Sequence, residues 1–188
     1  MPRFLAFVLL LAACVTPAIA ADPAPASKVA VGEQAPKFTI TDSSGKVVDL
    51  QKLAEKGPVL VRLTCGCSGC DKELAYFQQI HEAYKDDGLT SLLIFREPDE
   101  KVAKYAQEKK LDMLYAVDKK GESWKTFETK TMPTNFLIEK GGKISSIAAG
   151  CDPSGLLANS VSKKAALLVG VNAVNVKNKV EEKKAAAK

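Results

Sequence analysis

The feature that most constrains the fold of this chain is a cysteine cluster placed between a buried strand and an amphipathic helix. Residues 59–64 form an apolar, β-branched run of the kind found in strands that are buried on both faces. From residue 68 to about residue 86, apolar side chains recur with a helical period. Cys65, Cys67 and Cys70 lie at the junction. This order predicts a strand-then-helix unit with its cysteines at one end of a central strand.

The remaining patterns complete an α/β chain. Strands and helices alternate, and a glycine pair near the C-terminal end marks a closing hairpin, so the sequence predicts a three-layer α/β/α sandwich with a mixed central sheet. The expected elements are strands at 38–41 and 46–49, a helical turn at 50–56, a strand at 90–95, a helix at 98–110, a strand at 113–117, a helical stretch around Trp124, strands at 135–139 and 143–147, and a helix at 154–169.

The N-terminal residues 1–20 have the composition of a signal peptide: Arg3, then an apolar run, then small residues up to Ala20. The apolar run is shorter than the about 20 residues that span a bilayer. We expect cleavage after Ala20. The alternative is lipidation of Cys14, because residues 11–14 resemble a lipobox, and Cys14 would then anchor the protein to a membrane. With either form of processing, the protein is expected to be exported to a periplasmic or other extracytoplasmic compartment, where disulfides persist.

The rest of the chain is expected to contain a flexible leader at 21–30, one domain at 31–170 and a charged Lys/Ala-rich tail at 171–188. The net charge of +5 does not indicate a nucleic-acid partner, because residues 177–188 alone hold five lysines against two glutamates. Without an interleaved aromatic and basic stripe, the folded part does not resemble a nucleic-acid surface. The tail is predicted to be a solvated, frayed helix or a disordered end.

Cys67 and Cys70 have the CxxC spacing of a redox-active pair. At a helix N-terminus the first sulfur lies among unpaired N–H groups, which favours its thiolate, the species that attacks disulfides. Three residues later, Cys70 is close to the same helical face and can resolve the mixed disulfide. We therefore predict Cys67 as the nucleophile and Cys70 as the resolving thiol. A structural disulfide, or a metal site built from Cys65, Cys67, Cys70 and Cys151, are the alternatives.

Three segments resemble the redoxin and alkyl hydroperoxide reductase/thiol-specific antioxidant group of the thioredoxin-like superfamily. They are residues 31–38, the strand, cysteines and helix start at 58–73, and the loop and hairpin at 132–144. The resemblance covers roughly residues 31 to 168. It implies a thioredoxin-like fold and an exported thiol:disulfide oxidoreductase that acts on protein thiols and disulfides, is served by an upstream redox partner and uses no cofactor.

The resemblance also implies roles for individual residues. Pro133 would be a cis-proline beside the redox pair, and an X-Pro bond in a loop before a strand is a candidate for cis on general grounds. Met132 and Gly66 would contact the bound substrate chain. Gly66 replaces the tryptophan usual before the first cysteine, and Arg62 stands roughly where a buried acid or amide often assists proton transfer.

Four further residues are auxiliary or structural candidates. Cys65 and Cys151 can bridge each other, pass electrons to the CxxC pair or remain free, and a structural bridge between them is the preferred hypothesis. Glu73, assigned to the helix's first turn, either assists proton transfer or places a favourable charge there. His81 lies fourteen residues beyond Cys67, about 21 Å along a helix, and cannot activate that thiol. It is therefore interpreted as a partly buried helix residue.

A peroxiredoxin-like thiol peroxidase is the second hypothesis for function. Thr64 lies three residues before Cys67, as in peroxiredoxins, and Cys67 would be the nucleophile. However, Pro58 is too far from Thr64 for the proline of that motif. Met132 and Pro133 stand where peroxiredoxins bring an arginine to the thiolate, so dithiol exchange is preferred. A copper or zinc carrier built on the cysteine cluster is the third hypothesis.

Overall fold

The computed structural model describes residues 28–186, which fold around one mixed five-stranded sheet. The strands are arranged in the order β5-β4-β3-β6-β7. Strand β3 pairs in parallel with β4 and antiparallel with β6, and β7 adds a second antiparallel pair. The three-layer thioredoxin-like sandwich predicted from the sequence is confirmed. The strands are β3 (Val59–Thr64), β4 (Thr90–Phe95), β5 (Leu114–Val117), β6 (Thr134–Ile138) and β7 (Ile144–Ala149).

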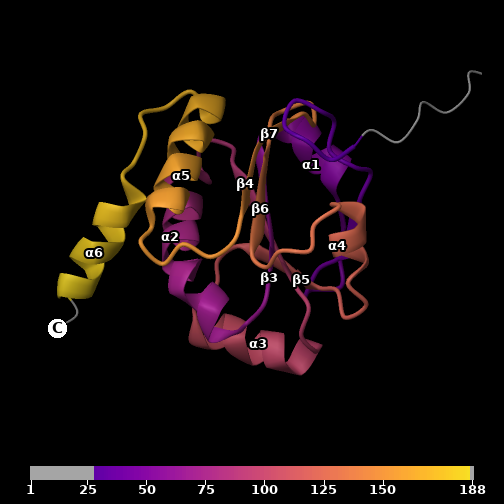
Figure 1. Ribbon diagram of the computed structural model, residues 1–188, viewed down its shortest axis with the longest axis horizontal. Helices are drawn as coiled ribbons and strands as arrows, with labels where there is room; N and C mark the ends of the chain where they lie inside the picture. The colour runs from indigo at the N-terminus through magenta and orange to yellow at the C-terminus, as the bar shows by residue number, and fades with distance from the viewer. Residues whose placement is uncertain (1–27, 187–188) are drawn as a thin grey trace, which may run out of the picture.

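Helices cover both faces of this sheet, as Figure 1 shows. On one face lie α2 (Ser68–Tyr84) and α5 (Leu156–Val169), with α3 (Asp99–Glu108) packed near the N-terminal turns of α2. The other face is covered by α1 (Leu50–Lys56), α4 (Glu122–Thr126) and a separate hairpin of β1 (Thr39–Thr41) and β2 (Val47–Asp49). No helix within residues 28–186 combines the length and the apolar character that crossing a membrane requires.

The central strand β3 is buried along its whole length and supplies both halves of the core. Because successive side chains of a strand point to opposite faces, Val59, Val61 and Leu63 join the core beneath α1 and α4. Leu60 and Arg62 face α2 instead. Trp124, Phe127 and Phe136 are buried in the first of these cores, which confirms the prediction that they are structural.

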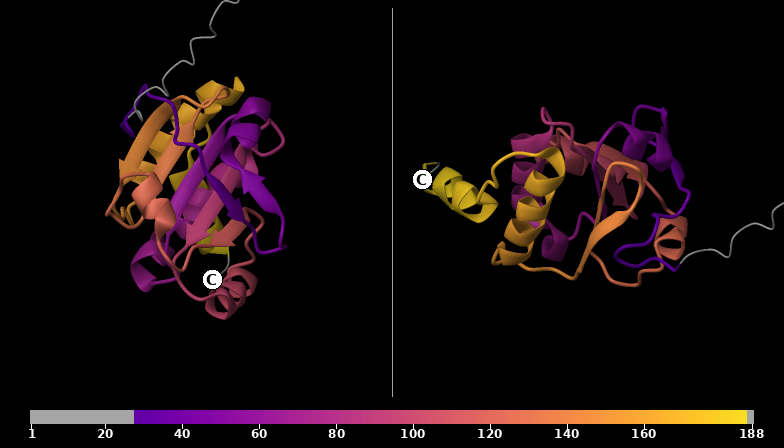
Figure 2. Two further views of the ribbon diagram at one scale, coloured as in Figure 1. Left: turned by 90° about the vertical axis from the view of Figure 1, so that its right-hand side faces the viewer. Right: turned by 90° about the horizontal axis from the view of Figure 1, so that it is seen from above.

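The charged C-terminal segment is a packed helix rather than a frayed or disordered end. Helix α6 (Val176–Ala186) lies outside α2 and α5, on the side away from the sheet, as seen from above in Figure 2. Its lysines are exposed except for the half-buried Lys177, but Val176 and Val180 are buried against the other two helices. The preceding loop is held by Tyr84, whose hydroxyl oxygen accepts a hydrogen bond of 2.8 Å from the backbone N–H of Val174. Two valines among many lysines gave too weak a pattern to predict this packing.

This packing makes a prediction for stability. Val180→Ser removes most of a buried side chain, so we expect the free energy of unfolding to fall by about 2 kcal/mol. Leu167→Ser, at a residue of α5 that is 80% exposed, is the matched control and should leave stability nearly unchanged. Urea denaturation followed by circular dichroism measures both. Equal stability of the two variants would show that α6 does not pack on the domain in solution.

Candidate functional site

Three sulfur atoms meet where β3 ends and α2 begins. Cys67 is the N-cap residue of α2, and its sulfur is disulfide-bonded to that of Cys65. The Sγ of Cys70 lies 3.3 Å from the Sγ of Cys65. All three sulfurs lie within 4.8 Å of one another, Cys67 being exposed, Cys65 half-buried and Cys70 buried. The structure therefore brings together a trio of sulfurs where the sequence had predicted a pair.

The bonded pair differs from both pairings considered from the sequence. Cys67 is bonded to Cys65 rather than to Cys70, and the expected bridge between Cys65 and Cys151 is wrong. Cys65 and Cys67 are two residues apart, and the turn before α2 brings their Cα atoms to 5.3 Å, a usual separation for a disulfide. Cys151 lies beside the first turn of α2, where its thiol donates to the carbonyl oxygen of Gly69 at 2.9 Å.

The start of α2 is an electrostatically positive place for the Cys67 sulfur. Cys67 has extended backbone geometry, and no side chain caps the first N–H groups of the helix. Asp71 is the acidic residue of the first turn, but its carboxylate accepts hydrogen bonds of 2.8 Å from both the Tyr105 hydroxyl and the Lys109 ammonium. After reduction of the disulfide, this helix end can stabilise a thiolate at Cys67.

A buried ion pair lies directly behind the trio. The Arg62 guanidinium donates to the carboxylate of Glu73 at 3.1 Å, to the side-chain oxygen of Asn135 at 2.7 Å and to the carbonyl oxygen of Cys70 at 3.3 Å. The guanidinium also stacks over the ring of Phe77. Burial lowers the pKa of Arg62 from its ordinary value, and the nearby Glu73 carboxylate opposes that shift. This network fixes the backbone of Cys70.

Glu73 has a different place from the one expected. It lies in the second turn of α2 and is fully buried, so its carboxylate does not interact with the helix start. Its second oxygen accepts a 2.7 Å hydrogen bond from the backbone N–H of Asp152. Glu73 thus joins β3, α2 and the loop after β7, and Arg62 is its ionic partner. Its position is that of a structural link between three elements.

The Met132–Pro133 peptide bond is cis, as predicted. Thr134 pairs with Leu63 in the antiparallel register of β6 and β3, so the loop before β6 lies beside the end of β3 that leads into Cys65. The carbonyl oxygen of Pro133 accepts a 2.8 Å hydrogen bond from Gly150. This bond places the proline loop next to the segment that carries Cys151.

Gly66, predicted to contact substrate, lies between two residues that the sequence did not single out. Its N–H donates to a carboxylate oxygen of Glu97 at 2.8 Å, and a side chain in its place would contact the ring of Tyr105. A substrate chain therefore has to displace Glu97 to use that N–H. Next to Gly66 is a pocket of about 280 Å³, whose other lining residues are Phe95, Glu97, Lys101, Val102, Lys104, Tyr105 and Glu108.

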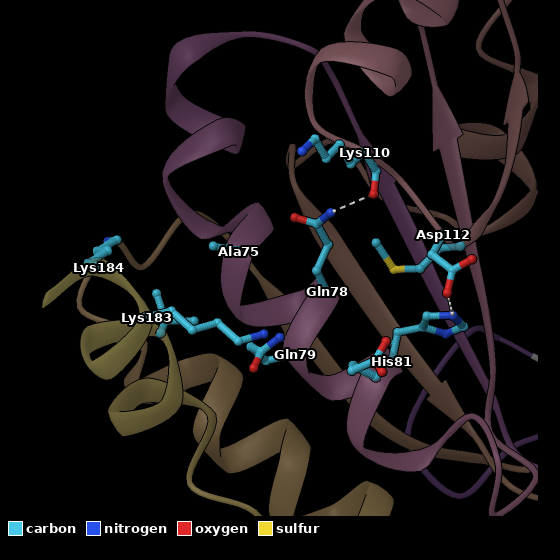
Figure 3. Close-up of a pocket in the computed structure, with 11 residues that line it drawn as sticks. Ala75, Gln78, Gln79, His81, Lys110, Asp112, Lys183 and Lys184 are labelled. Atoms are coloured by element: carbon cyan, nitrogen blue, oxygen red, sulfur yellow. Dashed lines mark hydrogen bonds and ion pairs between the residues drawn. The ribbon is translucent and has the colours of Figure 1, made fainter. Parts of the chain in front are cut away.

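His81 lies in a second pocket, away from the sulfurs. Its Nε2 is 3.9 Å from a carboxylate oxygen of Asp112, and the two side chains face each other in Figure 3. Burial lowers the pKa of His81, although Asp112 opposes the shift. The pocket, of about 470 Å³, lies between α2, α6 and the loop before β5, and none of the cysteines within residues 28–186 lines it. The interpretation of His81 as a partly buried helix residue is confirmed.

Cys151 should be a slow thiol although it is exposed. Partial burial of the sulfur raises its pKa, and the negative charge of Glu73 adds to the shift. Its S–H bond to Gly69 is lost on ionisation, which also favours the thiol. We expect alkylation of Cys151 by iodoacetamide to reach half its maximal rate at a pH above about 8.5, the ordinary thiol value.

This rate is measured by mass spectrometry of the peptide 144–163 across a pH series. Free glutathione under the same conditions is the control. A midpoint at or below that of glutathione would contradict the expected shift.

Two polar residues of the site left a signal in the sequence: Arg62, which was already an auxiliary candidate, and Asn135, which was not recognised. Arg62 and Asn135 are polar residues in otherwise apolar strands, and the β3–β6 register places them opposite each other. A polar residue in each of two buried strands could have been recognised as a pair. Glu97, Asp71, Tyr105 and Lys109 carried no such signal, because charged and aromatic residues on helices and loops are ordinary.

Comparison with known proteins agrees with this architecture. Residues 31–147 match the family model described as the AhpC/TSA family. The thiol-disulfide oxidoreductase ResA of Bacillus thuringiensis subsp. konkukian is 34% identical over 118 residues, which cover 62% of this chain and 68% of ResA. ResA of Geobacillus kaustophilus is 31% identical over 123 residues, covering 65% of this chain and 71% of that protein.

Solved structures share the fold. A crystal structure described as the thiol:disulfide interchange protein DsbE from Chlorobium tepidum superimposes with a TM-score of 0.69 at 22% identity, over 76% of this chain and 99% of that one. The solution structure of a thiol:disulfide interchange protein from Bacteroides sp. gives a TM-score of 0.62 at 28% identity, over 74% of this chain and 92% of that one. The chain therefore belongs to the AhpC/TSA family, as a thioredoxin-like redoxin of the thiol-disulfide oxidoreductase type.

Proposed function

We propose that this protein is an exported oxidoreductase that exchanges disulfides with other proteins through Cys67 and Cys70. The observation that carries the proposal is the position of Cys67 at the uncapped start of α2, with Cys70 in the same helical turn and a third sulfur in contact. An exposed sulfur at a helix N-terminus is suited to attack, and a buried one behind it is suited to resolution.

In the proposed reaction the Cys67 thiolate attacks a substrate disulfide. One substrate sulfur leaves as a thiolate, and a mixed disulfide joins Cys67 to the other. The Cys70 thiolate then attacks the Cys67 sulfur, which releases the second substrate thiol and leaves the enzyme oxidised. Two electrons pass from the enzyme to the substrate, and an upstream redox partner returns them. The burial of Cys70 keeps external disulfides from reacting there first.

The substrate is proposed to be an extended polypeptide lying along the Met132–Pro133 loop. Pro133 donates no backbone hydrogen bond, so the loop offers the peptide groups of Met132. The pocket beside Gly66 has Glu97, Lys101 and Tyr105 on its walls and would receive a side chain of the substrate.

Export is the part of the proposal that rests on the N-terminal residues, which lie outside the described residues. Cleavage of the signal after Ala20 and lipidation at Cys14 give mature proteins of different mass. Expression in a bacterium with intact-mass measurement distinguishes cleavage after Ala20 from lipidation at Cys14. An unprocessed N-terminus beginning at Met1 would overturn export.

The activity is tested by reduction of insulin disulfides with the dithiothreitol-reduced protein, followed by turbidity. We expect turnover well above the rate of dithiothreitol alone. A parallel assay with hydrogen peroxide tests the peroxidase hypothesis. Peroxide turnover without insulin reduction would replace the proposed function with the peroxidase.

A second candidate, carriage of a soft metal ion, is favoured by one observation. The sulfurs of Cys65, Cys67 and Cys70 lie within 4.8 Å of one another, and after reduction of the disulfide they can serve as three thiolate ligands. Thiolates select Cu(I) or Zn²⁺. Native mass spectrometry of the reduced protein with Cu(I) or Zn²⁺ tests this function. Retention of metal against a competing chelator would support carriage, and its complete loss would exclude it.

A further inference from the structure

The sulfur of Cys65 lies between the sulfurs of Cys67 and Cys70 and can form a disulfide with either. It is bonded to the Cys67 sulfur on one side and is 3.3 Å from the Cys70 sulfur on the other. We propose that Cys65, Cys67 and Cys70 form a three-sulfur relay in which the disulfide moves from Cys65–Cys67 to Cys65–Cys70 and frees Cys67. This inference rests on the proposed function and adds Cys65 as a third redox residue.

The relay step needs no external oxidant or reductant. The Cys70 thiolate attacks the Cys65 sulfur, a new Cys65–Cys70 bond forms, and the Cys65–Cys67 bond breaks with its electron pair leaving on Cys67. One disulfide and one thiol are present before and after the step. The proton that Cys70 gives up is taken by Cys67 or by water.

The surroundings favour this direction of transfer. Cys70 is buried, whereas Cys67 is exposed at the helix start, so the negative charge moves from a dry position to one stabilised by helix N–H groups and water. The two reacting sulfurs are already 3.3 Å apart, with the carbonyl of Cys70 bound by Arg62 and Cys65 directly following β3. Intramolecular contact of this kind replaces a bimolecular encounter.

The relay gives the oxidised protein an activity that a two-cysteine site lacks. With the disulfide at Cys65–Cys70, Cys67 is a free nucleophile although the protein has already lost two electrons. Its attack on a wrongly paired protein disulfide forms a mixed disulfide that neither Cys65 nor Cys70 can resolve. Only another thiol of the substrate can release Cys67, so the substrate is rearranged without net reduction. The oxidised form is therefore a disulfide isomerase.

The relay is tested on the full chain carrying one disulfide. Free thiols are labelled briefly with light iodoacetamide, the protein is reduced, and the remaining thiols are labelled with a heavy form. Trypsin, which cleaves after Arg62 and Lys72, places all three cysteines in the peptide 63–72, and fragmentation assigns a label to each. Cys151, free in the structure but expected to react slowly, shows how far a free thiol of raised pKa is labelled in the same time. We expect light label on Cys67 in a substantial share of molecules.

Two variants make the labelling decisive. Cys70→Ser locks the Cys65–Cys67 bond, so its Cys67 should stay unlabelled. Cys67→Ser keeps only the pair in contact and should form the Cys65–Cys70 disulfide, seen as a loss of two hydrogens in intact mass. The relay does not operate if Cys67 is labelled no more in the wild type than in Cys70→Ser. It also does not operate if Cys65 and Cys70 both remain free thiols in Cys67→Ser.

The isomerase activity has its own assay. Oxidised wild type should reactivate ribonuclease with scrambled disulfides without any added thiol, and faster than oxidised Cys65→Ser, in which the disulfide is confined to Cys67–Cys70. Equal rates would overturn the isomerase activity. Failure of the proposed function is distinguishable, because it shows as a reduced wild type that does not reduce insulin, whereas the labelling is read without a substrate.

Discussion

Cys67→Ala is expected to lower the rate of insulin reduction at least about 100-fold, because the remaining thiols lack the exposed position at the helix start. Cys70 is buried, and Cys65 is half-buried at the end of β3. Neither can approach a polypeptide disulfide as Cys67 can. The initial rate with dithiothreitol as electron donor measures this loss, and the melting curve of the variant shows whether it is folded.

Cys70→Ser is expected to act differently, because it removes a resolving thiol and keeps the nucleophile. The variant should accumulate mixed disulfides with substrate, visible as adducts on a non-reducing gel and by intact mass. In reduced Cys70→Ser the free thiol of Cys65 can still resolve the mixed disulfide at Cys67. Trapping of the substrate should therefore be more complete in the double variant Cys65→Ser/Cys70→Ser. Leu167→Ser, at an exposed position on α5, is the control for expression and folding and should form no adduct.

Two outcomes would contradict this assignment. Full insulin reduction by Cys67→Ala would transfer the nucleophile's role to another cysteine. Mixed disulfides mapped to Cys151 in the Cys70→Ser variant would give that role to the loop after β7. The raised pKa of Cys151 argues against the second outcome, since a thiol that stays protonated attacks slowly.

The fold could be predicted from the sequence because its elements are marked locally. The apolar run of β3, the glycine pair before β7 and the helical period of α2 each reflect burial or turn geometry that a short segment determines. The cis bond before Pro133 was predicted from the resemblance of residues 132–144 to the family's proline loop, because an X-Pro bond by itself is only a candidate for cis. The packing of α6 was not predicted, because it depends on two valines that are buried against α2 and α5, whereas the lysines around them dominate the composition of the helix.

The cysteines of the site were predicted from the sequence, but the disulfide that joins two of them was not. Cys65, Cys67 and Cys70 were recognised from spacing, but which two of them are joined depends on the turn of three residues before α2. Spacing does not encode that turn. Glu97 and Tyr105, which surround Gly66, are brought to the site by β4 and α3, so their role depends on tertiary structure.

Arg62→Met is expected to lower the free energy of unfolding by about 3 to 5 kcal/mol, because it leaves the Glu73 carboxylate buried without its ionic partner. Arg62 and Glu73 are 1% and 0% exposed, so water cannot replace the lost interaction in the folded state. Glu73 would keep only the hydrogen bond from Asp152. Urea denaturation at neutral pH measures the change, and Lys125→Ala, which breaks an exposed ion pair with Glu122, should cause no measurable loss.

The double variant Arg62→Met/Glu73→Leu separates the value of the pair from the cost of an orphaned charge. Replacing both partners with apolar residues removes the buried carboxylate, so the double variant should be more stable than Arg62→Met alone. A double variant that is equally unstable would mean that the loss comes from Asn135 and the Cys70 carbonyl, the other two acceptors of Arg62. Because Arg62 holds that carbonyl, the double variant should also form the Cys65–Cys70 disulfide less readily than wild type. The ion pair would then position the relay as well as stabilise the fold.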